Sequence, residues 1–99
     1  MLTVCLSVNE IEDGLKELDG WEIKLGKLHK TFKFKNFIQA FGFMTQVAII
    51  AEKQDHHPEW FNVYGEVVVD LVSHDVQGIT RRDLRLARAM DFAGQSNCS

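Results

Sequence analysis

Apolar residues recur along the chain with two periods, one typical of helices and one typical of strands. The first stripe at helical spacing consists of Ile11, Leu15 and Leu18. Asn9 precedes this stripe and has Glu12 three residues on, which is the arrangement of a capping box. We therefore expect a helix that begins near Asn9 and ends before Gly20, preceded by an N-terminal arm over residues 1–8.

Alternation of apolar and polar residues follows and predicts two paired strands. The apolar positions of the two runs are Trp21, Ile23 and Leu25, then Leu28, Phe32 and Phe34. Lys30 is an exception to the alternation in the second run. Gly26 and Lys27 lie between the runs, so a two-residue hairpin turn is expected there.

A longer apolar segment, residues 36–54, predicts the second helix. Asn36 has Gln39 three residues on as its capping partner. At about 100° per residue, apolar side chains cover roughly half of the helix circumference, wider than the stripe that packing on one sheet needs. Ile38 and Ile49 add an apolar spot on the otherwise polar face. Two interpretations are open: a well-buried core helix, or a helix that packs on its own sheet and also on a partner's helix.

The second interpretation implies assembly, because exposed apolar patches of this extent usually mark an interface. We therefore expect a homo-oligomer, either a homodimer that extends the sheet or a homotetramer in which the long helices meet. Phe43 is placed near the edge of the apolar arc. A charge at that position is expected to break the association or to unfold the chain.

Two runs rich in β-branched and aromatic residues, at residues 60–64 and 67–74, predict a second hairpin. The dipeptide between them, residues 65–66, is expected to form the turn. With that turn His57 is paired with His74, so a third histidine returns to the neighbourhood of the first two.

The last helix is predicted to begin at Thr80, where Asp83 completes a capping box and Ile79 and Leu84 form a hydrophobic staple. Residues 94–99 are expected to form a loose polar tail. The buried side of the last helix is expected to consist of Leu84, Leu86, Ala87 and Met90. A basic face, which is either solvated or a binding patch, consists of Arg81, Arg82, Arg85 and Arg88. Because cations in a first helical turn oppose the helix dipole, acidic or anionic neighbours are expected beside the first two arginines.

Together the elements predict a single α+β domain over residues 1–99, with a four-stranded antiparallel sheet, three helices packed on one face, and the order α-β-β-α-β-β-α. The chain is 45% hydrophobic with a net charge of -3, which gives no basic signature for nucleic acid. No apolar run is long enough to span a membrane, and the opening residues lack the basic flank of a signal peptide. Cys5 and Cys98 lie near opposite ends, so both are expected to be reduced, in a cytoplasmic protein or alternatively a nuclear one.

Two adjacent histidines meet the single proline of the chain at residues 56–58. Within one helical turn, beside Trp60, lie four titratable side chains: Glu52, Asp55, His56 and His57. Proline disfavours helix at the residue before it, so the helix should end upstream and leave His57 extended. Ordinary core packing does not need such a group, and we interpret it as an active site.

Three uses of the histidines compete. A zinc site is one, but consecutive side chains diverge, so His56 and His57 are poorly placed to bind one metal. Acid-base catalysis suits divergent imidazoles better, because they can address different atoms of one substrate and titrate near neutral pH. Structural capping by the same pair is the third use. His29 is isolated from the group and is expected to be an exposed strand residue.

Several segments form a recognisable set: Phe41-Gly42-Phe43-Met44-Thr45, Glu52-Lys53, Asp55-His56-His57-Pro58-Glu59-Trp60-Phe61-Asn62-Val63-Tyr64, Ser73-His74, Gly78-Ile79-Thr80 and Asp83-Leu84. Together they resemble the pterin-4a-carbinolamine dehydratase family over nearly the whole chain. The resemblance implies dehydration of 4a-hydroxytetrahydrobiopterin to quinonoid dihydrobiopterin in tetrahydrobiopterin recycling, with neither metal nor organic cofactor. It also implies the fold described above, assembled as a dimer or a dimer of dimers. Some animal members act as dimerisation cofactors for a homeodomain transcription activator. The alternative function is therefore a protein-binding module, and a hydroxylase or a transcription factor is a candidate partner.

The resemblance also implies roles for individual residues. His57 would be the principal proton-transfer group, with His56 and His74 binding and assisting. Glu52 and Asp55 would tune the imidazoles or hold the amide edge of the pterin, and Trp60 would form an apolar wall. Ser73 and Asp75 would contact the substrate through their backbone. The full set of expected substrate-binding residues is Glu52, Asp55, Pro58, Trp60, Ser73, Asp75 and Asp83. The family's usual threonine-histidine-glutamate reads Ser73-His74-Asp75 here, a conservative departure.

Overall fold

The computed structural model describes residues 4–97 of the 99-residue chain, with side chains as far as residue 95. The elements are α1 (Val8–Leu15), β1 (Glu22–Lys24), β2 (Lys27–Lys33), α2 (Phe37–Gln54), β3 (Glu59–Val63), β4 (Glu66–Leu71) and α3 (Arg81–Asn97). Their order is the one that the apolar pattern predicts. Among the described residues, no helix combines the length and the apolar character needed to cross a bilayer.

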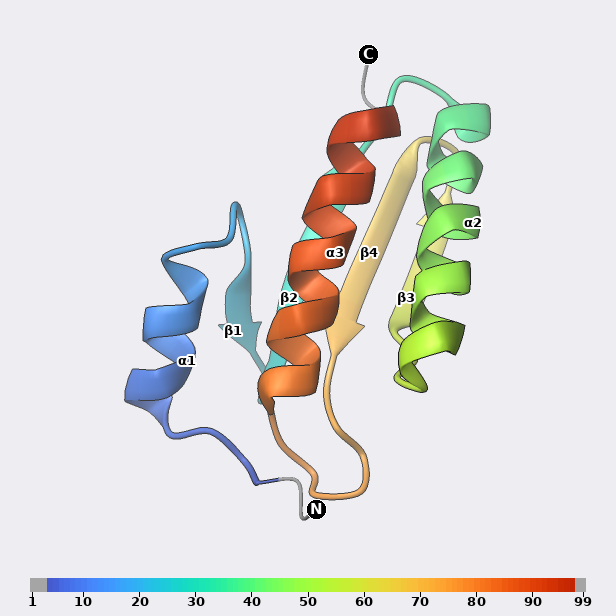
Figure 1. Ribbon diagram of the computed structural model, residues 1–99. Coiled ribbons are helices and arrows are strands. Elements are labelled where there is room, and N and C mark those ends of the chain that lie inside the picture. The colour runs from blue at the N-terminus through green and yellow to red at the C-terminus, as the bar shows by residue number, and fades with distance from the viewer. Residues whose placement is uncertain (1–3, 98–99) are drawn as a thin grey trace.

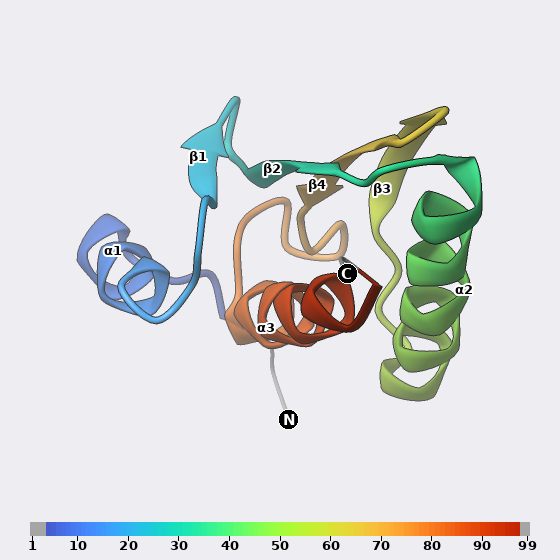
Figure 2. The same ribbon diagram turned by 90° about the horizontal axis from the view of Figure 1, so that it is seen from above.

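The strands form one antiparallel sheet in the order β1-β2-β4-β3. All three helices lie on the same face of this sheet, with α3 between α1 and α2 (Figures 1 and 2). The predicted α+β architecture, with its one-sided helical layer, is confirmed.

The first hairpin turns one residue earlier than predicted. Lys24 pairs with Lys27, so the turn is Leu25-Gly26, and these two residues have φ angles of 52° and 77°. Short hairpin turns of this kind need positive φ at both central positions, which puts the glycine second rather than first. Leu25 is consequently 93% exposed and is not on the buried face with Trp21.

The second hairpin also turns one residue early, because Val63 pairs with Glu66. Its turn begins at Tyr64, which has a φ of 51°. Gly65 lies against the end of β2: the N–H of Phe34 donates to its carbonyl oxygen at 2.7 Å, and a Cβ on Gly65 would collide with the carbonyl oxygen of Phe34. The close approach of the neighbouring strand therefore decides where this turn lies.

The shifted turn changes the register near the histidines. Trp60 faces Val69, and β4 ends at Leu71. The predicted strand pairing of His57 with His74 is therefore wrong, and His74 lies instead in the loop at residues 72–80.

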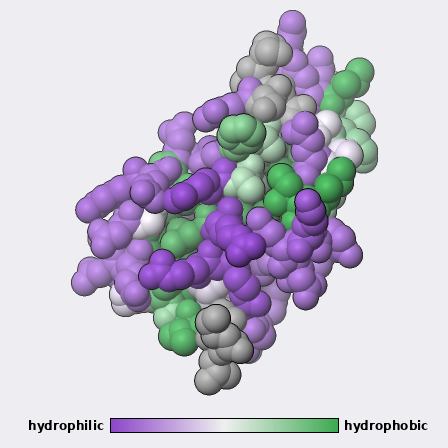
Figure 3. All heavy atoms as spheres, viewed as in Figure 1, coloured by the Kyte–Doolittle hydropathy of each residue, from purple (hydrophilic) through white to green (hydrophobic). Residues whose placement is uncertain are grey.

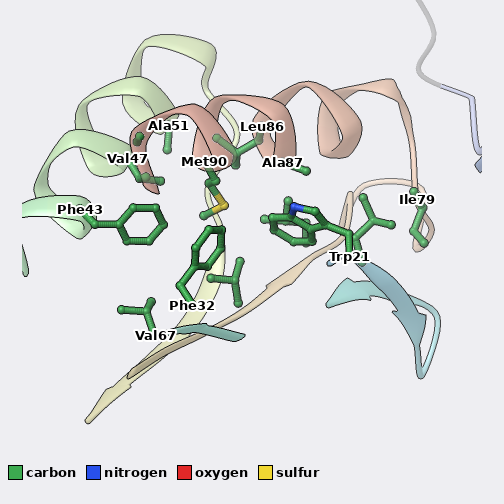
Figure 4. Close-up of a cluster of buried hydrophobic side chains, with 14 of the residues drawn as sticks. Trp21, Phe32, Phe43, Val47, Ala51, Val67, Ile79, Leu86, Ala87 and Met90 are labelled. Carbon is green, nitrogen blue, oxygen red and sulfur yellow. The ribbon is translucent and has the colours of Figure 1, made fainter. Parts of the chain in front are cut away.

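Side chains of α2, α3 and the sheet form the hydrophobic core (Figure 4). Phe43 is fully buried in it, with its ring centroid 4.6 Å from that of Phe32. Phe43 is thus fully buried although it lies near one edge of the apolar arc, because the arc alone does not show which part of it faces the sheet. Six apolar residues of the two long helices have no exposed surface: Ala40, Phe43, Val47, Leu86, Ala87 and Met90.

The helix α2 also has an apolar side in solvent. Ile38 is 81% exposed and Ile49 is 62% exposed. Phe37 and Phe41, which are exposed too, have ring centroids 5.6 Å apart. Figure 3 shows apolar residues gathered over the α2 side of the molecule. The core interpretation of this helix accounts for the side around Phe43 and leaves the other side uncovered.

Capping residues begin two of the helices where the sequence predicts. Asn36 accepts the backbone N–H of Gln39 at 2.9 Å, and Asp83 accepts that of Thr80 at 2.9 Å. At α1 the capping box is formed by Ser7 and Glu10, two residues before the expected pair. In this box Ser7 Oγ accepts the N–H of Glu10, and Glu10 Oε1 accepts the N–H of Ser7. Two backbone donors at the start of the helix are thereby satisfied.

Lys30, the polar exception in β2, is explained by its contacts. Its ammonium group lies 2.8 Å from Asp91 Oδ1 and 4.4 Å from the ring centroid of Phe32. The helix α3 continues through Gly94 to Asn97, so the prediction of a loose tail is wrong for residues 94–97. Residues 98–99 lie outside the described part. A glycine suits position 94 of this helix, because a Cβ there would lie only 3.1 Å from Phe32 Cε2, which is closer than an ordinary van der Waals contact.

The first two arginines of α3 have the acidic neighbours that the helix dipole predicts. Arg82 forms an ion pair with Asp75 at 2.5 Å, and Arg81 lies 4.0 Å from Glu10. The basic face of this helix is thus partly neutralised by residues from other segments.

Candidate active site

The end of α2 separates the two adjacent histidines. Asp55 adopts the left-handed conformation, with φ 51° and ψ 42°, and the N–H of His56 donates to the carbonyl of Ala51 at 3.1 Å. Such a cap ends a helix and turns the chain sharply. The side chain of His56 is 8% exposed and that of His57 is 57% exposed, so the predicted divergence of the pair is confirmed.

His56 belongs to a buried polar network. Its Nε2 lies 2.5 Å from Asp83 Oδ1, and the other carboxylate oxygen of Asp83 accepts the Ser73 hydroxyl at 3.0 Å and the Thr80 N–H at 2.9 Å. A carboxylate with these partners is an acceptor, so the network assigns a hydrogen to His56 Nε2. The Thr80 hydroxyl then donates to Ser73 Oγ at 2.8 Å. The carboxylate of Asp83 thus joins the end of α2 to the loop after β4.

The other two histidines of the group are exposed. His57 Nε2 lies 2.8 Å from Glu52 Oε1, and His74 Nε2 lies 3.0 Å from Glu59 Oε2. The end of α2, the start of β3, the end of β4 and the start of α3 meet at one end of the sheet (Figure 1). All three imidazoles therefore place Nε2 against a carboxylate, each against a different one. Within residues 4–97, no three histidine, cysteine, aspartate or glutamate side chains are grouped as ligands for one metal ion.

The loop that carries His74 is closed on itself and tied to α3. The N–H of Ser73 donates to the carbonyl of Gly78 at 2.9 Å. Arg82 donates to Asp75 at 2.5 Å, and this hydrogen bond, aided by the arginine's charge, holds the pKa of the Asp75 carboxyl below its ordinary value. The loop thus has a defined conformation on both sides of the histidine.

Comparison with known proteins identifies the family to which the chain belongs. The family described as Pterin 4 alpha carbinolamine dehydratase matches residues 5–93 of the chain. The chain belongs to this family. The resemblance of the sequence motifs is thereby confirmed, and so is the expectation of an enzyme, since the family is one of hydro-lyases.

Individual relatives cover most of the chain. A protein from Solibacter usitatus that carries the name of pterin-4-alpha-carbinolamine dehydratase is 50% identical over 90 residues, which are 91% of this chain and 95% of that protein. A Prochlorococcus marinus protein of the same name is 56% identical over 86 residues, covering 87% and 90%. Among solved structures, a transcriptional coactivator/pterin dehydratase from Brucella melitensis has 45% identity and a TM-score of 0.89, covering 92% of this chain and 99% of its own. The fold and the family therefore agree.

Within this dehydratase fold the predicted site residues divide by exposure. The exposed ones are Glu52, Asp55, His57, His74 and Asp75, the half-buried ones are Pro58 and Trp60, and the buried ones are His56, Ser73 and Asp83. Asp83 has no exposed surface, and its side chain is used by His56, Ser73 and Thr80. Direct contact between the Asp83 side chain and a substrate, which the motif suggests, is therefore incompatible with this structure.

His29 differs from its prediction. Its side chain is 13% exposed, and its Nδ1 lies 2.9 Å from Asp70 Oδ1. The two residues face each other across β2 and β4, so opposed side chains form the contact. The expected exposed strand residue is thus partly buried and hydrogen-bonded to Asp70.

Two residues near His74 were not predicted as part of the site. Glu59 is part of the motif at residues 55–64 but was assigned no role, although it is the next acidic residue after the histidine pair. Lys27 donates to the carboxylate of Glu59 at 2.6 Å. No local pattern marks Lys27, because it meets Glu59 through the strand order β2-β4-β3.

A hollow of about 700 Å³ lies between α1 and α3, away from the residues of the motif. Its charged walls are formed by Glu10, Asp13, Glu17, Arg81, Arg85 and Arg88. The candidate site is consequently recognised by its side-chain chemistry rather than by its depth.

Proposed function

We propose that the chain dehydrates 4a-hydroxytetrahydrobiopterin to quinonoid dihydrobiopterin and water, in tetrahydrobiopterin recycling, without a metal or an organic cofactor. The observation that carries this proposal is the group of three carboxylate-bound imidazoles at one end of the sheet of a chain in the dehydratase family. The names of its relatives supply the substrate class.

The reaction breaks the bond between C4a and its hydroxyl group. One proton must reach the departing hydroxyl, and one must leave a ring nitrogen, so two groups of opposite duty are needed. His57 and His74 are the exposed imidazoles of the group, and each has Nε2 engaged by a carboxylate. In the neutral form each therefore has Nδ1 free to take up a proton, and in the charged form each can return it. We assign the principal transfer to His57, with His74 assisting.

The remaining residues support these two. His56 is buried against Asp83, so its contribution is to hold the chain at the end of α2 in place. Asp55 and Glu52 are exposed and suited to the polar amide edge of a pterin. Trp60 and Pro58 are half-buried and suited to an apolar wall, and the backbone of Ser73 and Asp75 lies next to His74.

The direct test is an assay of the purified protein with freshly generated 4a-hydroxytetrahydrobiopterin, following product formation above the spontaneous rate. Parallel assays with and without a chelator test the metal-free part of the proposal. Turnover that disappears on chelation and returns with zinc would contradict that part, and a rate no higher than the spontaneous one would contradict the assignment as a whole.

The same proposal includes a homo-oligomer, either a homodimer or a homotetramer. Its support is the exposed apolar side of α2 at Ile38 and Ile49, together with exposed Phe61 on the edge strand β3. Ile49→Glu is expected to reduce the mass measured by light scattering without unfolding the chain, since Ile49 is outside the core. Phe43 is unsuited to this test because it is fully buried. A folded wild-type monomer at micromolar concentration would contradict the assembly.

A protein-binding role is the second candidate. The exposed side of α2 favours it, and the Brucella melitensis neighbour is called a coactivator as well as a dehydratase. Binding of a hydroxylase or a transcription factor by a variant that lacks turnover would support it independently of the enzyme assay.

A further inference from the structure

Glu59 is placed between a lysine and a histidine. Its Oε1 accepts a hydrogen bond from Lys27 Nζ at 2.6 Å, and its Oε2 lies 3.0 Å from His74 Nε2. Lys27 begins β2 and Glu59 begins β3, so the strand β4 lies between them in the sheet. The two oxygens of this carboxylate are thus used by groups from separate segments.

The donor inventory of the three side chains fixes the position of the hydrogens. A lysine ammonium donates and never accepts, and an ionised carboxylate accepts and never donates. His74 Nε2 must therefore carry the hydrogen in its contact with Glu59. In the neutral imidazole this leaves the lone pair on Nδ1, which is turned away from the carboxylate.

The contact with Lys27 is strong enough to orient the carboxylate. The hydrogen bond to Glu59 raises the pKa of Lys27, with the charges of Glu59 and Asp70 adding to it against the effect of burial. Charge-assisted hydrogen bonds of this length are also the strong ones. Lys27 therefore restrains the carboxylate of Glu59 in the orientation in which its other oxygen contacts the imidazole of His74.

We propose that Glu59 and Lys27 are positioning residues that fix the tautomer of His74, so that Nδ1 faces the substrate with its lone pair. This inference rests on the proposed function, in which His74 takes part in proton transfer. Neither residue would touch the pterin. A surface ion pair without a role is the alternative, and such pairs contribute little by themselves.

The test uses Glu59→Gln in the full-length protein. Lys27 is expected to keep the amide oxygen, which turns the NH2 group towards His74 and makes Nε2 an acceptor. The hydrogen then moves to Nδ1, so the tautomer reverses. Nitrogen-15 NMR of the imidazole reports this directly at about pH 9, above the ordinary titration range of histidine near 6.5. Comparison with His74→Gln identifies the resonances.

Turnover supplies the second readout. Glu59→Gln is expected to lower kcat by about 10- to 100-fold, by analogy with loss of the carboxylate that orients a metal-bound histidine, with KM little changed. Adding Lys27→Met to this variant frees the amide to rotate and should restore a mixture of tautomers. Lys24→Met is the matched control, because Lys24 faces Lys27 across the first hairpin and should change neither readout.

The outcomes separate the inference from the function on which it rests. An unchanged tautomer in Glu59→Gln overturns the inference, as does a reversal that leaves kcat intact. Either result leaves the dehydratase proposal standing as long as the wild-type protein turns over. Absence of wild-type turnover instead overturns the proposed function and the catalytic part of this inference with it. Reversal together with a lower kcat supports the positioning role.

Discussion

His56 and His57 are neighbours in the chain and have the same partner chemistry, yet their surroundings differ. Each places Nε2 on a carboxylate, at 2.5 Å for Asp83 and 2.8 Å for Glu52. The first pair is buried, whereas the side chains of the second are 57% and 82% exposed. The left-handed cap at Asp55 causes the difference, because it turns the chain between the end of α2 and the extended segment. The His56 imidazole is therefore enclosed in the interior, whereas that of His57 is accessible from solvent.

The largest effect on the exposed side of this comparison is expected from His57→Ala. Turnover should fall by about 10²- to 10⁴-fold, the range for a positioned acid or base, while the free energy of unfolding changes little. Steady-state kinetics and urea unfolding measure the two quantities. His29→Ala is the matched control, since it also removes an imidazole from a carboxylate but should lower stability and leave turnover nearly intact. A folded His57→Ala protein with a near-wild-type rate would refute the catalytic assignment.

The largest effect on the buried side is expected from Asp83→Ala. The change leaves the His56 ring, the Ser73 hydroxyl and the Thr80 N–H without their acceptor in the protein interior. Removing one member of a buried pair costs about 3–5 kcal/mol, so the urea midpoint should fall sharply. A loss below about 1 kcal/mol, the size expected for an exposed pair, would show that the network is not essential to the fold.

Glu52→Gln is the exposed counterpart and should have a much smaller effect on stability. An exposed ion pair contributes about 0–1 kcal/mol and is weakened by salt. Urea unfolding should therefore show a difference from wild type of at most about 1 kcal/mol at low salt and a smaller one at high salt. A stability loss as large as that of Asp83→Ala would mean that exposure does not distinguish the two pairs.

The smallest expected effect concerns the loop that carries His74. The hydrogen bond from Arg82 lowers the pKa of Asp75 in the folded state. Its stabilising contribution is therefore complete above the ordinary aspartate value of about 3.9 and is lost as pH falls through the lowered folded value. Arg82→Gln should weaken this acid-dependent step, as measured by unfolding at a series of pH values from neutral to strongly acidic. Identical acid profiles of the variant and the wild type would contradict the assignment.

Local chemistry explains the features that could be predicted. Asn36 and Gln39, and likewise Thr80 and Asp83, are close in sequence, so their capping contacts follow from spacing alone. The divergence of His56 and His57 likewise follows from their consecutive positions in the chain. The candidate histidines and one partner, Glu52, could be named from the sequence, whereas Asp83 and Glu59 could not be named as partners of His56 and His74.

Non-local packing explains the features that were missed. The turn at Tyr64 depends on the approach of Phe34 to Gly65, and the burial of Phe43 depends on where the sheet lies. A one-residue difference in a turn moved His74 out of the strand ladder. Its partner Glu59 was overlooked because the contact joins a loop to the start of another strand.

The sequence by itself determined the order of helices and strands, the one-sided helical layer and the family, because apolar period, caps and motif residues are local properties of the chain. The tertiary structure alone decided that Asp83 is a buried partner of His56, that His29 meets Asp70, and that Lys27 meets Glu59. These contacts join residues that are 27, 41 and 32 positions apart, respectively. Their formation depends on strand order and register, which no short stretch of sequence contains.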